Sequence, residues 1–204
     1  MFSPADRDLE RGWPGRIEGD RVIQLAAQTL QSFFTGGGHA REHAEYALAD
    51  VVLRAPVLHP PSVRIFDGDD FSFSNPAAIH GPGDLVLLPE GADEIVPVLR
   101  RAAIVGAEGA LGAVTLMVEW VAPSLPGTKA RDFALSLGPT AVTPDKGGGD
   151  WDRLLARAAA NTRLVPGDLI VAPGDPGAPV RVGGAVELAV EPFGVLRVRV
   201  GTRR

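Results

Sequence analysis

The chain has 204 residues, of which 45% are hydrophobic, and a formal net charge of −5 at pH 7. This size provides the core of one substantial domain, and the negative charge disfavours a nucleic-acid or anionic-membrane surface. The absence of cysteine excludes disulfides, thiolate metal sites and cysteine nucleophiles. The sequence has no long apolar run for a membrane span and no signal-peptide pattern, which predicts a cytoplasmic protein. Its 25 glycines and 18 prolines indicate a β-rich fold with many turns.

The N-terminal part is expected to contain an arm and a small subdomain. Residues 1–14 are polar and rich in turn formers, which predicts a loosely held arm. Residues 15–55 are expected to form the subdomain. It opens with a hairpin over Gly15–Ala26 and continues as a short amphipathic helix over Gln24–Phe34, which a run of three glycines ends.

A second helix is predicted over His39–Ala49. It would place His39 and His43 on one helix face, as in helical metal-binding pairs. No third ligand follows at a matching spacing in the sequence, so a solvated helix face is the alternative.

Residues 56–204 are expected to form the main domain, with strands and one helix. The predicted strands are Leu85–Leu88, Arg101–Val105, Gly109–Val121 and two more between Val180 and Val200, and the helix covers Trp151–Asn161. Glu119 is the one charge in the apolar run Gly109–Val121. A buried carboxylate needs a cationic partner, for which Arg100 and Lys129 are the candidates.

Two stretches of the main domain resemble a known family. FSNPAAIHGPGD (residues 73–84) precedes AAIVG (102–106), and TKARDFALSLGP (128–139) precedes TPD (143–145). Both resemble the core of the fumarylacetoacetate hydrolase (FAH) family, and the resemblance extends over residues 15–201. It implies an α+β, β-rich fold, namely an FAH-type mixed β-roll with a small N-terminal strand–helix region. It also implies a homodimer.

Most members of this family hold Mg²⁺ or Mn²⁺ through a Glu-x-Glu pair and an aspartate. The resemblance assigns the pair to Val98 and Arg100 and the aspartate to Glu119. An aliphatic side chain donates no lone pair, and a guanidinium repels a cation that requires oxygen ligands. We therefore expect no metal cofactor. Asp67, Asp69 and Glu119 are the alternative metal ligands, although the aspartates also suit a solvated turn.

The resemblance assigns a family lysine to Lys129, which there assists substrate carboxylate binding or stabilises charge. We expect Lys129 and Arg100 to stabilise an enolate and Glu119 to move protons. The expected substrate-binding residues are Asp132, His80 and Asn75. The structural alternatives are an ion pair between Glu119 and Arg100 and a surface location for Lys129.

Two functions follow. The first is a metal-independent enzyme for a small oxo-acid, β-dicarbonyl or polyketide-like substrate, with enolate-type lyase, isomerase or hydrolase chemistry. It predicts a concave pocket lined by Lys129, Arg100 and Glu119. The second is a catalytically inactive homologue that binds a ligand or a partner protein, with a filled pocket. The family's metal-dependent carbon–carbon hydrolysis is not expected, because its lid and its substrate-contacting Gly-Thr pair also lack counterparts.

Overall fold

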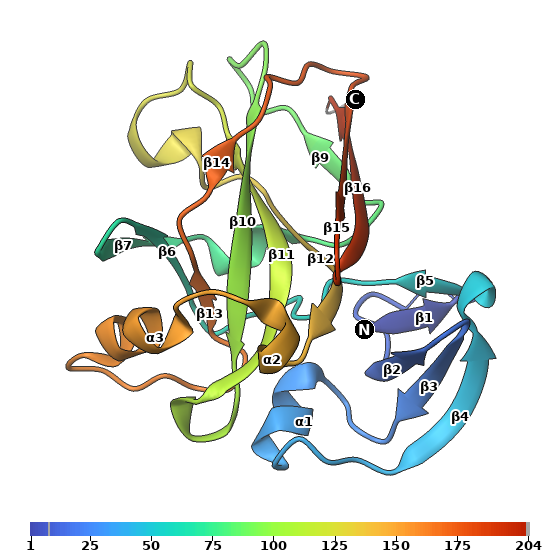
Figure 1. Cartoon of the computed structure of the whole chain (residues 1–204). Helices are drawn as coiled ribbons and strands as arrows, with labels where there is room; N and C mark the ends of the chain where they lie inside the picture. Colours follow the sequence, from blue (N-terminus) through green and yellow to red (C-terminus); the bar gives the residue numbers. More distant parts are fainter. Residues whose placement is uncertain (8, 203–204) are drawn as a thin grey trace.

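The body of the protein is a curled mixed sheet, seen in a computed structural model that describes residues 1–7 and 9–202 (Figure 1). The strand order is β7-β6-β13-β10-β11-β12-β8, and β14 pairs with β10 beside β13. The strands are β6 (Val63–Asp67), β7 (Asp70–Ser74), β8 (Ile79–His80), β10 (Val96–Val105), β11 (Leu111–Val121), β12 (Leu135–Val142), β13 (Leu169–Val171) and β14 (Asp175–Pro176).

Residues alternate between the two faces of this sheet, and each face has its own apolar core. Ala102 and Ile104 of β10 pack into the core on the concave face. Their neighbours Ala103 and Val105 pack on the other face against α3 (Trp151–Ala159). The predicted apolar stripe of this helix is buried there: Trp151, Leu154, Leu155 and Ala158.

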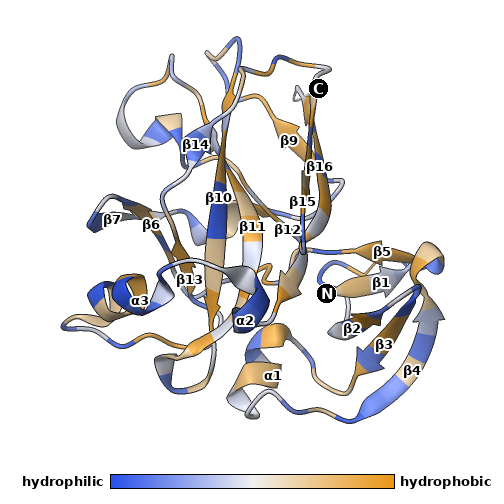
Figure 2. Ribbon diagram, viewed as in Figure 1, coloured by the Kyte–Doolittle hydropathy of each residue, from blue (hydrophilic) through white to orange (hydrophobic). Residues whose placement is uncertain are grey.

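A three-stranded sheet covers the same outer face further along β11. It consists of β15 (Ala185–Val190), β16 (Gly194–Gly201) and β9 (Leu85–Leu87). It packs on Val118 and Trp120 of β11, and the indole Nε1 of Trp120 donates to Ser136 Oγ at 2.9 Å. Two consecutive arginines give the otherwise apolar β10 a hydrophilic stretch (Figure 2).

The N-terminal region contains two small sheets and a capped helix. β1 (Phe2–Pro4) pairs with β5 (Val51–Leu53), and β2 (Gly15–Glu18), β3 (Arg21–Leu25) and β4 (Glu42–Ala47) form a meander. Thr29 caps α1 (Leu30–Thr35) through a capping box. The remaining helical turns are η1 (Leu48–Asp50), η2 (Pro76–Ala78), η3 (Ala107–Gly109), η4 (Gly127–Ala130) and α2 (Pro144–Gly147). None of the helices in the described residues has the length and apolar character of a membrane span.

The predicted helix over His39–Ala49 was wrong. Residues Glu42–Ala47 form strand β4, in which Ala44 and Tyr46 are partly buried and alternate with exposed neighbours. Tyr46 lies opposite Val22 of β3, so pairing with a neighbouring strand overrides the local helical pattern. His43 therefore lies on a strand, and the predicted histidine pair on a helix face does not form.

The predicted loose arm was also wrong for its first residues. Phe2 is buried, and its ring contacts Trp13 and Tyr46 at centroid distances of 6.1 and 5.3 Å. The predicted helix over Gln24–Phe34 is shorter than expected, because Gln24 still belongs to β3 and the helix begins after Thr29. The division of the chain after residues 14 and 55 stays a prediction.

Candidate functional site

Glu119 lies at the centre of a buried ion pair. The β10–β11 register places it opposite Val98, and its side chain is fully buried. Arg100, two residues along β10, donates from Nε to Glu119 Oε2 at 2.9 Å. The resemblance assigns three metal-binding carboxylates to Val98, Arg100 and Glu119. These three positions lie next to one another, and an ion pair joins Arg100 to Glu119.

The guanidinium of Arg100 is held from several sides and is only 3% exposed. Its Nη1 donates to the carbonyl oxygens of Phe66 and Ala172 at 3.1 and 3.2 Å. Its Nη2 donates to Asp67 Oδ1 at 3.1 Å. Arg100 thus joins β10 to the ends of β6 and β13, and its orientation is fixed.

Arg131 extends the pair into a chain of alternating charges. Its Nη1 lies 3.4 Å from Glu119 Oε1 and 3.7 Å from Asp67 Oδ2. Glu119 Oε1 accepts no hydrogen bond from the described residues. Because Asp67 is 63% exposed and Arg131 is partly exposed, the chain leads from the buried Glu119 to solvent. Arg131 was not predicted as a site residue, although it directly precedes the matched Asp132 in the TKARDF segment.

These residues do not fit a divalent metal ion. Two guanidinium groups lie against the one carboxylate that remains, and Val98 offers no ligand atom. Within residues 1–7 and 9–202, no group of three or more histidine or acidic side chains could hold a metal. The alternative ligand Asp69 is exposed and pairs instead with Arg153 at 2.6 Å.

Lys129 lies at the surface, as the alternative prediction for this residue states. It belongs to η4 and is 75% exposed, and its Nζ donates to Asp132 Oδ2 at 2.7 Å. No contact between Lys129 and Glu119 occurs among the described residues. Of the two cationic partners expected for Glu119, the structure brings only Arg100 to it.

Asn75 holds two segments of this region together. Its Oδ1 accepts from the backbone N–H of Ala77 at 3.0 Å and caps η2, and its Nδ2 donates to the carbonyl of Asp132 at 2.9 Å. His80 lies on β8, opposite Ser136 of β12. Burial lowers the pKa of His80, and the nearby Asp84 partly opposes this shift. Asn75 and Asp132 are thus joined to each other, whereas His80 makes no hydrogen bond or ion pair with Glu119 among the described residues.

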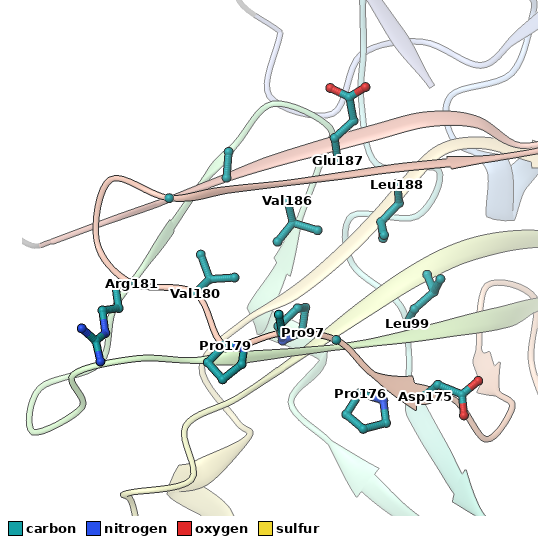
Figure 3. A pocket seen from close by; sticks show the side chains of 14 residues that line it. Pro97, Leu99, Asp175, Pro176, Pro179, Val180, Arg181, Val186, Glu187 and Leu188 are labelled. Atoms are coloured by element: carbon teal, nitrogen blue, oxygen red, sulfur yellow. The ribbon is translucent and has the colours of Figure 1, made fainter.

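A cavity of about 700 Å³ lies on the other side of β10, between β14 and β15 (Figure 3). Pro97 and Leu99 line it, and they alternate along β10 with Val98 and Arg100. Side chains at alternate positions of a strand point to opposite faces. This cavity therefore does not contain Glu119, and it is not the concave pocket expected around Lys129, Arg100 and Glu119.

Comparison with solved structures identifies the fold, although no protein-family model and no curated protein gave a match to the chain. The maleylpyruvate hydrolase from Sphingobium sp. SYK-6 matches with a TM-score of 0.79 and 20% sequence identity, over 94% of this chain and 97% of that one. It is a member of the fumarylacetoacetate hydrolase superfamily. The chain has the fumarylacetoacetate hydrolase fold. The predicted FAH-type β-roll is therefore confirmed.

Other structures of this fold also match over more than 90% of both chains. The 5-carboxymethyl-2-hydroxymuconate delta-isomerase from Mycobacterium smegmatis has a TM-score of 0.76 and 21% identity, over 94% of both chains. The 2-hydroxyhepta-2,4-diene-1,7-dioate isomerase from Mycobacterium marinum has a TM-score of 0.74 and 20% identity, over 94% of this chain and 93% of that one. A second structure of the maleylpyruvate hydrolase, in complex with manganese(II) ion and pyruvate, matches over 95% of this chain and 97% of that one. Its TM-score is 0.79 and its sequence identity is 20%.

Proposed function

We propose that this chain is a metal-independent FAH-fold enzyme for a small oxo-acid, whose carboxylate binds between Arg100 and Arg131. One observation carries the proposal: the carboxylate of Asp67 bridges these two guanidinium groups, at 3.1 and 3.7 Å, where the ion-pair chain reaches solvent. Asp67 occupies the place that a substrate carboxylate would take.

Exchange of Asp67 for a substrate is physically reasonable. Asp67 lies at the exposed end of β6 and its side chain is 63% exposed, so it can turn away into solvent. Arg100 is already oriented by Glu119 and two backbone carbonyls, so binding would not require it to be ordered. The planar fork of an arginine matches a carboxylate in two parallel hydrogen bonds.

The same residues offer acid–base chemistry. A guanidinium beside the oxo group would stabilise the negative oxygen of an enolate. Glu119 Oε1, which accepts no hydrogen bond from the described residues, is the oxygen available to take a proton. Lys129 lies in the neighbouring η4 and pairs with Asp132 just after it, and we assign Lys129 to attraction of the anionic substrate. The hydrolase and isomerase names of the FAH-fold relatives support this substrate class.

The alternative is a catalytically inactive protein that binds a ligand or a partner. Two observations favour it: Glu119 is fully buried, and the guanidinium of Arg100 is 3% exposed. In this case the ion pair stabilises the roll, and no substrate reaches Glu119. The homodimer and the cytoplasmic location also remain proposals.

Calorimetric titration of the EDTA-treated protein with pyruvate tests the carboxylate site. We expect saturable binding that Arg131→Gln weakens by about tenfold or more, because a hydrogen bond to a charged group is lost. Arg101→Gln is the matched control, since Arg101 is exposed and faces the opposite side of β10. No binding of pyruvate would rule out the site.

Turnover separates the enzyme from the inactive protein. The EDTA-treated protein is incubated with a panel of acylpyruvates and oxo-diacids, and substrate loss is followed by absorbance and NMR. Turnover that Glu119→Gln abolishes supports the enzyme. Binding without turnover supports the inactive protein, and turnover only after addition of Mn²⁺ would refute metal independence.

A further inference from the structure

A second buried arginine, Arg64, has hydrogen-bond donors that nothing in the described part of the chain accepts. It lies on β6 and is 5% exposed. Its Nε and Nη1 are buried and have no hydrogen-bond partner among the described residues. Buried polar groups are nearly always hydrogen-bonded, so unmet donors in a guanidinium indicate a missing acceptor.

Asp168 balances the charge of Arg64 but does not satisfy its donors. Its Oδ2 lies 3.6 Å from Arg64 Nη1, which is too long for a hydrogen bond. The two oxygens of Asp168 instead accept from other groups: Oδ1 from Ser62 Oγ at 2.7 Å, and Oδ2 from the backbone N–H of Val165 at 2.8 Å. Arg64 Nε and Nη1 are thus left without an acceptor among the described residues.

Arg64 lines a pocket of about 240 Å³ between β7 and the C-terminal end of α3. The lining residues are Arg64, Asp70, Phe71, Phe73, Arg157, Ala158, Ala160, Asn161 and Thr162. The guanidinium carbon of Arg64 lies 5.9 and 5.4 Å from the ring centroids of Phe71 and Phe73. Phe73 is 68% exposed, so its ring is accessible from solvent beside this cation.

This pocket is separate from the ion-pair chain around Arg100. Val63 and Ile65 of β6 pack into the core of the concave face, whereas Phe66 packs on the outer face with α3. By alternation, Arg64 shares the outer face with Phe66, and Asp67 belongs to the other. The inference is thus independent of the proposed function.

We propose that this pocket binds a small organic carboxylate with a flat aromatic body. The carboxylate pairs with the charge of the Arg64 guanidinium from the pocket that this residue lines, and Arg157 provides a second cation at the rim. The aromatic body packs on the exposed ring of Phe73, where a purely inorganic anion would leave the ring in water. Asp70 is the one acid of the lining, and its Oδ1 is already paired with Arg157 at 3.2 Å.

Charge at the helix end is compatible with this ligand. The C-terminal end of a helix carries a partial negative charge, which opposes an anion. Arg157 lies in the last turn of α3 and offsets this charge. Two arginines against one aspartate leave the pocket lining with a net charge of +1.

NMR titration of the full chain with benzoate, acetate, benzamide and inorganic phosphate tests the proposal. We expect saturable benzoate binding with an affinity on the order of millimolar, and shifts of the amide signals of Asn161 and Thr162. Acetate should bind more weakly because it lacks the ring, and benzamide should not bind because it lacks the charge.

Four variants separate this site from general anion attraction. Arg157→Gln should weaken benzoate binding about tenfold, whereas Arg153→Gln should not. Arg153 is the matched control. It lies one turn earlier on α3, has a similar exposed fraction and pairs with Asp69, just as Arg157 pairs with Asp70. It does not line the pocket. Arg64→Lys keeps a charge for Asp168 but loses the planar fork, so it should also weaken binding about tenfold. Phe73→Ser should abolish the preference for benzoate over acetate.

The proposal fails if benzoate does not bind saturably, or if it binds the Arg64→Lys and Arg157→Gln variants as tightly as the wild type. Binding of phosphate without binding of benzoate would also overturn it. Arg131→Gln, in the other site, should leave the benzoate affinity unchanged, and a loss there would assign the binding to the ion-pair chain instead.

Discussion

Glu119→Gln keeps the shape of the side chain but removes the charge that Arg100 contacts at 2.9 Å. Because both side chains are buried, the variant leaves a buried guanidinium whose remaining acidic contact is the exposed Asp67. Breaking one side of a buried ion pair costs about 3–5 kcal/mol. Asp67 and two backbone carbonyls still hold Arg100, so we expect a loss of about 3 kcal/mol in the free energy of unfolding. For a chain of this size, the melting temperature should fall by roughly 6–12 °C.

Urea unfolding followed by tryptophan fluorescence measures this loss as a lower midpoint at an unchanged slope. Glu187→Gln is the control: its pair with Arg197 is shorter, at 2.6 Å, but exposed, so the midpoint should not move. The double variant Glu119→Leu, Arg100→Met removes both charges and should recover most of the loss. A midpoint of Glu119→Gln equal to that of the wild type would refute the buried ion pair.

Three further predictions follow from the same region. The His80 imidazole should titrate by NMR below its usual pKa of 6.5, because burial disfavours its charged form. The unfolded chain then binds more protons, so stability should fall as the pH is lowered through 6.5, and His80→Asn should remove this part of the pH dependence. Asn75→Ala should lower the free energy of unfolding by about 1–2 kcal/mol through loss of the η2 cap and the bond to Asp132. Asn75→Asp keeps the cap acceptor and should cost less, and equal losses in urea unfolding would contradict this assignment. Calorimetry with Mg²⁺ and Mn²⁺ should give no saturable heat, and stoichiometric binding would contradict the poor fit of the site to a metal.

Local patterns predicted the elements in which the positions of the apolar residues by themselves show which side chains are buried. The apolar run Gly109–Val121 is strand β11, and the stripe on Trp151–Ala159 is helix α3. β4 was missed because its partly buried residues, Ala44 and Tyr46, become recognisable only opposite β3. The burial of Phe2 was missed for the same reason, since its partner Tyr46 is distant in sequence.

The sequence by itself predicted the β-roll through long matched segments. It also predicted that Val98 and Arg100 cannot bind a cation, because this depends on residue type alone. Only the tertiary structure decided which charges meet. Arg131 rather than Lys129 contacts Glu119, and Arg64 Nε and Nη1 are buried without a hydrogen-bond partner among the described residues. These outcomes depend on strand register and chain crossings, which bring together side chains that are far apart in sequence. Spacing along a chain does not encode such distances, whereas the packed sheet does.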